Sequence, residues 1–317
     1  MSIIKHITHL PQTIFNHLRY PKSACILFMK RTAKMWPDEL YLKIMCYLRL
    51  GYRVNLKNPT TFNEKLNWLK LHNRKPIFTL MADKYAVKKF VAERVGDEHV
   101  VTCYGSWNNA DEIDFDTLTY PIVLKGTGAT SDVAICHSRE EIDIEGIRAK
   151  LNKSIKRNLF YSSREWPYKN VKSRVIAEKF LSDGFGTKLL DYKFWCFNGK
   201  PQIMYIANKG AHGKKLFENY YDMGFQPLNI NHNFIRHTPE FSKPAGFEVM
   251  KSLCCKLLEG LELPFVRVDF FYVNGCVYFA EFTFFDWAGM RPFPNHDDDV
   301  KLGKMIDLTP LMKENNS

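Results

Sequence analysis

Apolar residues recur along the first third of the chain at the spacing of amphipathic helices. Between residues 38 and 51, one helical face is predicted to carry Leu40, Ile44, Tyr47 and Leu48, and Gly51 ends the run. Thr61, with Glu64 three residues later, has the capping-box pattern that starts a helix. A further helix is predicted over residues 79–95. This part of the chain is therefore predicted to be helical.

The pattern changes near residue 99, where short runs of β-branched and aromatic residues bounded by turn residues indicate strands. These runs are HVVTCYGSW, YPIVLKG, SDVAICHS, RVIAEKFL, LLDYKFWCFNGKPQIMYIA, PFVRVDFFYV and CVYFAEFTFF. Two helices are predicted between them, at residues 143–156 and 247–259. Helices followed by hairpin-like strands indicate an α+β fold with antiparallel sheets.

The length and composition are those of a globular protein. The 317 residues suffice for two or three packed subdomains, and no apolar run reaches the roughly 18–20 residues that a membrane-spanning helix needs. The N-terminus does not have the pattern of a secretory signal. The eight cysteines form no CxxC pair, which favours free buried thiols, no zinc site and a reducing, cytoplasmic compartment.

Net charge is concentrated at the front of the chain. Residues 1–75 hold 14 Lys and Arg against 3 Asp and Glu, a difference of +11, whereas the other 242 residues hold 31 of each sign. A basic, helix-prone segment of this kind suits an anionic membrane or nucleic acid, or simply exposes its cations to water. No nucleic-acid-binding motif occurs there, so we expect no nucleic-acid partner. A peripheral contact with the anionic inner face of the membrane remains the hypothesis to test.

The last two predicted strands carry charges in the middle of apolar runs. Arg267, Asp269 and Glu281 each interrupt such a run, and a buried charge is costly unless it is paired or bound to a metal ion. A three-residue loop, Val273-Asn274-Gly275, would place Arg267 opposite Glu281, with Asp269 as their near neighbour.

In that register the hairpin has one polar and one apolar face. The polar face would hold Arg267, Asp269, Glu281 and Thr283, and the apolar face Val266, Val268, Phe270, Tyr278, Ala280 and Phe282. Two acids, an arginine and a hydroxyl suit a magnesium ion and a phosphate, because the ion prefers hard oxygen ligands. The alternative is a salt bridge from Arg267 to Asp269 and Glu281 that braces the sheet. A two-residue turn would put Asp269 and Glu281 on opposite faces and weaken the metal interpretation.

Two lysines are further candidates for binding phosphate. Lys125 ends a predicted strand and precedes the small residues Gly126, Thr127, Gly128, Ala129, Thr130 and Ser131, which would let backbone N–H groups approach a phosphate. The P-loop pattern GxxxxGK[ST] is absent, and an ordinary hairpin turn is the alternative interpretation. Lys84 could equally be one more cation on a solvated helix face.

Two strand segments add weaker candidates. Glu178-Lys179-Phe180-Leu181 ends a predicted strand, where a chain leaving the sheet could offer backbone groups to an adenine edge. Asp191 and Lys193 alternate onto one face of another strand. By composition alone, neither segment is unusual.

Taken in order, these segments resemble the TupA-like (teichuronopeptide biosynthesis) ATP-grasp family over about residues 38–308. The resemblance rests on LKNPTTFNEKLNWLKLHNR, DKYAVKKFV, Ile-Val-Leu-Lys125 with its glycine-bearing loop, NLFYSSREWPYKNVKSRVIAEKFL, LLDYKFWCFNGKPQIM, LPFVRVDFFYVNGCVYFAEFTFF and the Lys301-Leu-Gly303 region. It implies an ATP-grasp fold, in which two α+β subdomains grip ATP, behind a basic helical region. The implied domains are residues 1–75, basic and helical; 76–118, a helix and connecting strand; 119–181, the small ATP-grasp subdomain; and 182–317, the large one with the magnesium-binding hairpin.

The resemblance also implies roles for individual residues, with ATP and Mg²⁺ as cofactors. Phosphate contacts would come from Lys84, Lys125 and the loop that includes Gly126 and Gly128. An adenine-binding hinge would come from Glu178 and the backbone of Lys179 and Leu181, and a ribose contact from Asp191. Lys193 would contact phosphate or substrate, Arg267 the developing oxyanion, and Asp269 and Glu281 the magnesium. Thr283 stands where many ATP-grasp ligases have Asn, and a hydroxyl is a weaker metal ligand.

The implied reaction joins a carboxylate to an amine through an acyl phosphate, in the synthesis of a surface polysaccharide. A uronic acid-type or other carboxylate sugar and an amine or amino acid are the implied partners. Residues 284–289 depart from the Pro- and Gly-containing loop expected there, which bears on acceptor specificity. Two alternatives belong to other classes: a metal-dependent glycosyltransferase of polysaccharide synthesis, and a non-enzymatic basic binding protein.

Overall fold

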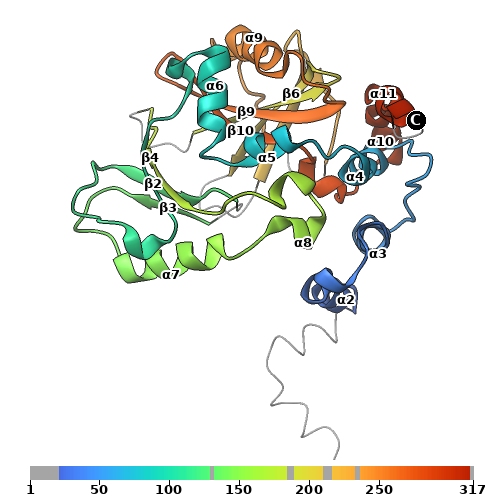
Figure 1. The fold of residues 1–317 in the computed structure, drawn as a ribbon. Helices are drawn as coiled ribbons and strands as arrows, with labels where there is room; N and C mark the ends of the chain where they lie inside the picture. Colours follow the sequence, from blue (N-terminus) through green and yellow to red (C-terminus); the bar gives the residue numbers. More distant parts are fainter. Residues whose placement is uncertain (1–20, 129–131, 184–188, 210–215, 233–235, 315–317) are drawn as a thin grey trace, which may run out of the picture.

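The protein contains two antiparallel sheets with helices packed around them (Figure 1), in the computed structural model that describes residues 21–128, 132–183, 189–209, 216–232 and 236–314. Residues 1–20, the first part of the region predicted to be basic and helical, lie outside these ranges. The α+β class with antiparallel sheets is confirmed. No helix in the described ranges is both long and apolar enough to cross a membrane.

The smaller sheet has four strands in the order β1-β4-β2-β3. These strands are β1 (Cys103–Trp107), β2 (Ile122–Gly126), β3 (Val133–Cys136) and β4 (Val175–Lys179). Helix α7 (Ile144–Ile155) starts at the N-cap Asp143, and its buried Leu151 packs on this sheet together with the partly buried Ile144, Ile147 and Ile155. The helix predicted over residues 143–156 is thus confirmed.

The larger sheet has six strands in the order β10-β9-β5-β6-β7-β8. They are β5 (Asp191–Phe197), β6 (Lys200–Lys209), β7 (Leu216–Asp222), β8 (Pro227–Leu228), β9 (Phe265–Val273) and β10 (Cys276–Thr283). Helices α6 (Val87–Val95) and α9 (Phe247–Leu258) cover one face of it, as Figure 1 shows. The rings of Phe194 on β5 and Phe247 on α9 lie 6.0 Å apart, and those of Phe90 on α6 and Phe282 on β10 lie 6.2 Å apart.

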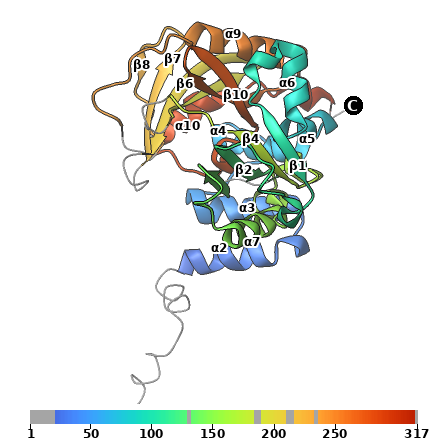
Figure 2. The same ribbon diagram turned by 90° about the vertical axis from the view of Figure 1, so that its left-hand side faces the viewer.

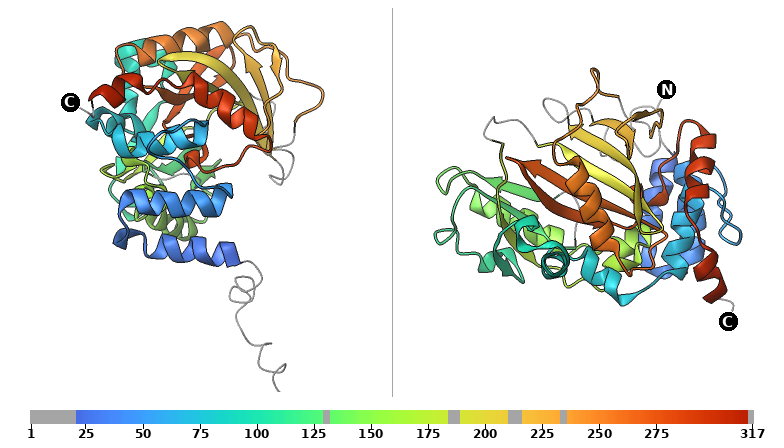
Figure 3. Two further views of the ribbon diagram at one scale, coloured as in Figure 1. Left: turned by 90° about the vertical axis from the view of Figure 1, so that its right-hand side faces the viewer. Right: turned by 90° about the horizontal axis from the view of Figure 1, so that it is seen from above.

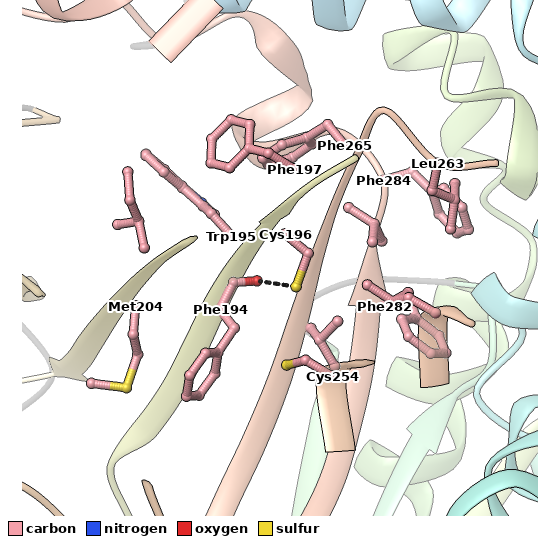
Figure 4. Close-up of a cluster of buried hydrophobic side chains, with 14 of the residues drawn as sticks. Phe194, Trp195, Cys196, Phe197, Met204, Cys254, Leu263, Phe265, Phe282 and Phe284 are labelled. Atoms are coloured by element: carbon pink, nitrogen blue, oxygen red, sulfur yellow. Dashed lines mark hydrogen bonds between the residues drawn. The ribbon is translucent and has the colours of Figure 1, made fainter. Parts of the chain in front are cut away.

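The core under this sheet is dense in aromatic residues. Figure 4 shows Phe194, Cys196 and Phe282 near Cys254 of α9, with the Cys196 thiol directed at the Phe194 carbonyl oxygen, 3.8 Å away. Burial of one such phenylalanine contributes about 1.5–3 kcal/mol. All eight cysteines are free. The sheet is therefore a rigid platform whose opposite face can carry polar groups.

The remaining helices border the two sheets. They are α2 (Pro21–Arg31), α3 (Asp38–Leu50), α4 (Phe62–His72), α5 (Pro76–Ala82), α8 (Leu159–Ser163), α10 (His296–Met305) and α11 (Thr309–Glu314). Figures 2 and 3 show α2 and α3 stacked at the end of the molecule away from α9. The view from above in Figure 3 shows α10 beside α4. The predicted capping box of Thr61 and Glu64 is present at the start of α4.

The predicted apolar face of α3 is buried only in part: Ile44 and Leu48 pack against the core, but the other two residues do not. Leu40 and Tyr47 are 44% and 53% exposed, whereas Tyr41 and Met45 are fully buried. The buried face of α3 is therefore rotated by about one residue from the predicted one. It is set by Tyr41, whose ring lies 4.0 Å below the guanidinium of the buried Arg164. A cation–π contact with a residue 123 positions away cannot be read from helical periodicity.

The helix expected over residues 79–95 is wrong, because it is two helices, α5 and α6. Asp83 separates them in an extended conformation, and its side chain accepts hydrogen bonds from the backbone N–H groups of Tyr85 (2.9 Å) and Ala86 (3.3 Å). An Asp side chain competes in this way with helical backbone bonding. The break places Lys84 in a tight turn instead of on a helix surface.

Candidate functional site

The register of the β9–β10 hairpin differs from the predicted one. Val273 pairs with Cys276, so the turn has two residues, Asn274 (φ 51°) and Gly275 (φ 82°), and not three. Asn-Gly suits such a turn because both central residues take positive φ. Continued without interruption, this register would put Asp269 and Glu281 on opposite faces of the sheet.

A β-bulge reverses that consequence. The pairing shifts between Phe279 and Glu281, leaving Ala280 as the extra residue, and beyond the bulge Glu281 pairs with Asp269 and Thr283 with Arg267. The four polar residues therefore share a face, as predicted, although Arg267 lies opposite Thr283 and not Glu281. The predicted apolar face needs one correction: Tyr278 pairs with Phe271, and Phe279 takes its place opposite Phe270.

A row of polar side chains crosses four strands on this face. Lys193 on β5 pairs with Tyr205 on β6 and with Asp269 on β9, which in turn pairs with Glu281 on β10. The Lys193 ammonium donates to Asp269 Oδ2 at 2.5 Å. Burial opposes the charge of Lys193, but Asp269, Asp191 and Glu281 together outweigh it and raise the pKa of the ammonium. Lys193 therefore stays charged at neutral pH.

Arg267 is the buried centre of this row, at 9% exposure. Its Nε and Nη2 donate to the two oxygens of Asp269, both at 2.7 Å, and its Nη1 donates to Asp286. Burial disfavours the guanidinium charge, yet Asp269 and its other anionic neighbours keep the pKa of Arg267 above its ordinary value. Asp286 is 1% exposed and was missed in the sequence, where its only signal is an acid directly after two phenylalanines.

Glu281 is held less tightly than Asp269. Its side chain is 31% exposed, with Arg267 Nη2 at 3.4 Å and Lys84 Nζ at 3.6 Å. Burial would raise the pKa of this carboxyl, but Lys84, Arg267 and other lysines outweigh it and lower the pKa to about 2. The Thr283 hydroxyl lies 3.5 Å from the carboxylate. Glu281 is thus an ionised acid among cations, with room for another ligand.

The two candidate phosphate lysines lie on either side of the junction between the sheets. Lys84, 13% exposed, sits in the α5–α6 turn, where its backbone N–H bonds to Thr127 at 3.4 Å while its side chain faces Glu281. Lys125 on β2 donates to Glu178 Oε2 at 2.5 Å, and Lys88 on α6 donates to Glu178 Oε1 at 2.7 Å. Lys88 was not singled out in the sequence.

Glu178 therefore orients lysines in this structure. Burial opposes its charge, but Lys125 and Lys88 lower the pKa of the carboxyl. The backbone N–H of Lys179 donates to the Thr102 carbonyl oxygen at 2.9 Å. Leu181 follows the strand and is partly buried.

The glycine-bearing loop after Lys125 is described only in part. Gly126 ends β2, and Gly128 is so closely packed that a Cβ there would lie 2.8 Å from the Ser173 hydroxyl. Residues 129–131 lie outside the described ranges, so that part of the predicted loop is not placed.

Two hollows lie on either side of the contact between Lys84 and Glu281. A small pocket of about 30 Å³ lies between the sheets, lined by Lys84, Val87, Lys88, Val100, Val101, Lys125, Glu178, Phe271, Phe279 and Ala280. A cleft of about 460 Å³, here called the large cleft, is lined by Lys193, Arg267, Glu281, Thr283 and residues of α8, β6, β7 and the turn after β10. Asp191, 42% exposed and 4.0 Å from Lys193, also lines the large cleft. Lys125 thus lines the small pocket on one side of the row of charges, and Asp191 lines the large cleft on the other.

A polar stripe on α4 fixes the turn that follows β10. Asn67 donates to the Gly289 carbonyl oxygen at 2.7 Å, and the fully buried Lys70 donates to the Ala288 carbonyl oxygen at 2.6 Å. Burial lowers the pKa of Lys70 to about 8. The bonds hold Trp287 and Ala288 in left-handed conformations, with φ of 47° and 56°. The sequence showed only a capped helix here, not that its polar residues position a cleft wall.

The acids present fit a magnesium ion in number and kind. Among the described residues, no three His, Cys, Asp or Glu side chains form a group that could hold a metal ion. Magnesium, however, is usually held by one or two carboxylates together with substrate phosphates and water. Both oxygens of Asp269 already accept hydrogen bonds from Arg267, whereas the contacts of Glu281 are long. Glu281 is therefore the more available of the two ligands.

Comparison with known proteins gives one family match. A family model described as TupA-like ATPgrasp matches residues 64–307. Among proteins of curated function, none matches this chain in sequence.

Similar solved structures include two ligases. The D-alanine–D-alanine ligase from Bacillus anthracis complexed with ATP is 18% identical, with 75% of this chain and 67% of that chain covered and a TM-score of 0.41. The L-amino acid ligase from Bacillus licheniformis is 14% identical, with 84% of this chain and 55% of that chain covered and a TM-score of 0.42.

Proposed function

Since this chain belongs to the TupA-like ATP-grasp family, we propose that it is an ATP- and magnesium-dependent ligase that joins a carboxylate to an amine. One observation carries the proposal. Lys84, which lines the small pocket, and Arg267, which lines the large cleft, lie 3.6 and 3.4 Å from the ionised Glu281. Cations around an acid between two such hollows suit the transfer of a phosphoryl group between two ligands.

ATP is proposed to bind between the two sheets, in the region where Lys84, Lys125 and Glu281 lie. Lys84 and Lys125 would bind its phosphates beside Gly126 and Gly128, while Glu178, the Lys179 carbonyl oxygen and Leu181 would face the adenine. Asp269 and Glu281, with the Thr283 hydroxyl beside them, would hold magnesium, which supplies charge neutralisation on the phosphates. Asp191 lines the large cleft, so it suits a contact to ribose or to substrate at the edge of the nucleotide site.

The large cleft is proposed to take the carboxylate substrate, with Lys193 and Arg267 facing its negative charge. A carboxylate oxygen attacks the γ-phosphorus of ATP, the bond to ADP breaks, and an acyl phosphate forms. The amine then attacks the carbonyl carbon, the bond to phosphate breaks, and the amine loses a proton. Arg267 would donate to the developing oxyanion, and positioning with charge neutralisation would do most of the work.

A uronic acid-type sugar in surface polysaccharide synthesis is the proposed carboxylate, with an amino compound as its partner. The large cleft has many polar residues, and Trp287, 41% exposed, lines it. An exposed indole in a polar cleft suits the apolar face of a sugar ring.

The test is a screen of uronic acids against amines for ATP-dependent release of phosphate. Release that needs both substrates is expected, whereas turnover of a sugar nucleotide without ATP would contradict the ligase and favour a glycosyltransferase.

Lys125→Ala should sharply reduce stabilisation by Mg·ATP, because it removes a cation proposed to contact phosphate. Thermal shift at saturating Mg·ATP measures this. Lys89→Ala is a matched control, because Lys89 lies on α6 with a side chain 85% exposed and pairs only loosely with Glu93 at 3.7 Å. Equal stabilisation of wild type and Lys125→Ala would remove Lys125 from the nucleotide site.

A peripheral contact with an anionic membrane is proposed for the front of the chain. The described part of this region exposes Phe28 (59%), Met35 (81%) and Tyr47 (53%) among basic residues. Each cation near an anionic surface contributes about 1 kcal/mol, and buried apolar side chains add to it. We expect co-sedimentation with anionic but not neutral vesicles, lost at high salt and on deleting about the first 35 residues. No binding to anionic vesicles at low salt would leave these helices as packing elements.

A further inference from the structure

The large cleft extends from the reacting groups to a wall supplied by the N-terminal helices. Lys30, near the end of α2, and Arg49, near the end of α3, line the same cleft as Lys193 and Arg267. Neither residue belongs to the charged row on the large sheet. The cleft therefore has two groups of cations that come from different parts of the fold.

Lys30 and Arg49 bring two like charges to the same cleft. Burial first, and then the charge of Arg49, lower the pKa of Lys30. Among the described residues, no Asp or Glu lies within ion-pair distance of either side chain. Two cations brought together from separate helices repel each other, and a bound anion would relieve that repulsion.

The helices that carry this pair are anchored to the cleft wall by a buried arginine. Arg164, 1% exposed, follows α8 and lies 2.8 Å from Asp38 at the start of α3. It also donates to the backbone carbonyl oxygens of Ala33 at 2.5 Å and Trp36 at 3.1 Å. Met290, from the turn after β10, packs into the same cluster as α2 and α3. The position of the cation pair is thus fixed relative to the reacting groups.

We propose that Lys30 and Arg49 form an oxyanion subsite for the acceptor, which takes a phosphate or a second carboxylate remote from the carboxylate that is activated. This inference rests on the proposed function, because the first carboxylate is assigned to Lys193 and Arg267. A substrate with an anion at each end would be fixed at two points. Binding energy from the remote group then positions the reacting carboxylate.

The test compares ligands that share one carboxylate. Calorimetric titration of the full-length protein with glucuronic acid, glucuronic acid 1-phosphate and digalacturonic acid separates the two sources of the second anion. Tighter binding of the 1-phosphate assigns the subsite to phosphate, and tighter binding of the disaccharide assigns it to carboxylate. Lys30→Ala/Arg49→Ala should weaken the tighter ligand by about tenfold, to the level of glucuronic acid.

The matched control is Lys22→Ala/Arg31→Ala, which removes two charges from α2 at residues outside the cleft lining. It should leave all three affinities unchanged. Equal affinity of wild type for the three ligands, an equal loss in the control, or no binding of either dianionic ligand would overturn the subsite. Stabilisation by Mg·ATP is measured in parallel, because its absence in wild type would contradict the ligase while the affinity differences still decide the subsite.

Discussion

Glu281→Gln should lower ATP turnover by about 100-fold or more while the protein remains folded. The substitution keeps the size of the side chain and removes the charge proposed to bind magnesium. The carboxylate is 31% exposed, and its contacts to Arg267 and Lys84 are 3.4 and 3.6 Å long. Its removal still leaves Arg267 paired with Asp269 and Asp286, so the protein should remain folded although it is less stable. Steady-state phosphate release and the magnesium concentration for half-maximal rate measure the effect.

Glu248→Gln is the control for this variant, because Glu248 makes exposed ion pairs with Lys243 and Lys251 away from both hollows. Its turnover should match wild type.

Glu281→Gln is also expected to lower the free energy of unfolding at neutral pH. A carboxyl with a pKa lowered to about 2 stabilises the fold above its unfolded pKa of about 4.3, and loses this contribution as pH falls toward 2. Full turnover in a folded Glu281→Gln protein would remove Glu281 from the metal site.

Asp269→Asn should instead lower the free energy of unfolding by about 3–5 kcal/mol. Asp269 is 2% exposed and is the shared partner of Arg267, at 2.7 Å to each oxygen, and Lys193, at 2.5 Å. An asparagine cannot match the charge of both cations and presents an amide N–H₂ to one of them. The salt-bridge interpretation of the hairpin thus holds for Asp269 whether or not the residue also binds metal. Urea denaturation monitored by tryptophan fluorescence measures the loss.

Asp191→Asn provides the matched control. It is the same substitution on a strand of the same sheet, but Asp191 is 42% exposed and 4.0 Å from Lys193. Its effect should stay below about 1 kcal/mol. If Asp269→Asn were as stable as wild type, Asp286 alone would suffice to compensate Arg267, and Asp269 could be treated purely as a ligand.

Local patterns fixed the elements that depend on neighbours in the chain. The capping box at Thr61 and Glu64, the end of α3 at Gly51 and the start of α7 after Asp143 follow from residues within four positions of each other. Alternation along β9 placed Arg267 and Asp269 on one face, because the side-chain period of a strand is two. The family followed from long motifs in a fixed order.

The tertiary structure decided what depends on pairing between distant segments. The predicted turn length was wrong, but the predicted polar face is present because a bulge at Ala280 returns Glu281 to the side of Asp269. A bulge depends on the pairing of two strands and has no signal in one strand alone. Asp286 belongs to the site because it accepts a hydrogen bond from the buried guanidinium of Arg267, whose burial is costly without such partners. Lys84 lies in a turn and not on a helix surface, because the Asp83 side chain accepts a backbone N–H that a continuous helix would use.

By itself, the sequence determined which residue types this protein has available for phosphate, magnesium and carboxylate chemistry, and on which elements they lie. Only the tertiary structure decided which of them meet. Local periodicity reports the environment of a residue along its own element, whereas a site is made by side chains that approach from different elements. Lys70 illustrates this difference: in the sequence it is one cation on a helix, and in the fold it is fully buried and holds the wall of the large cleft.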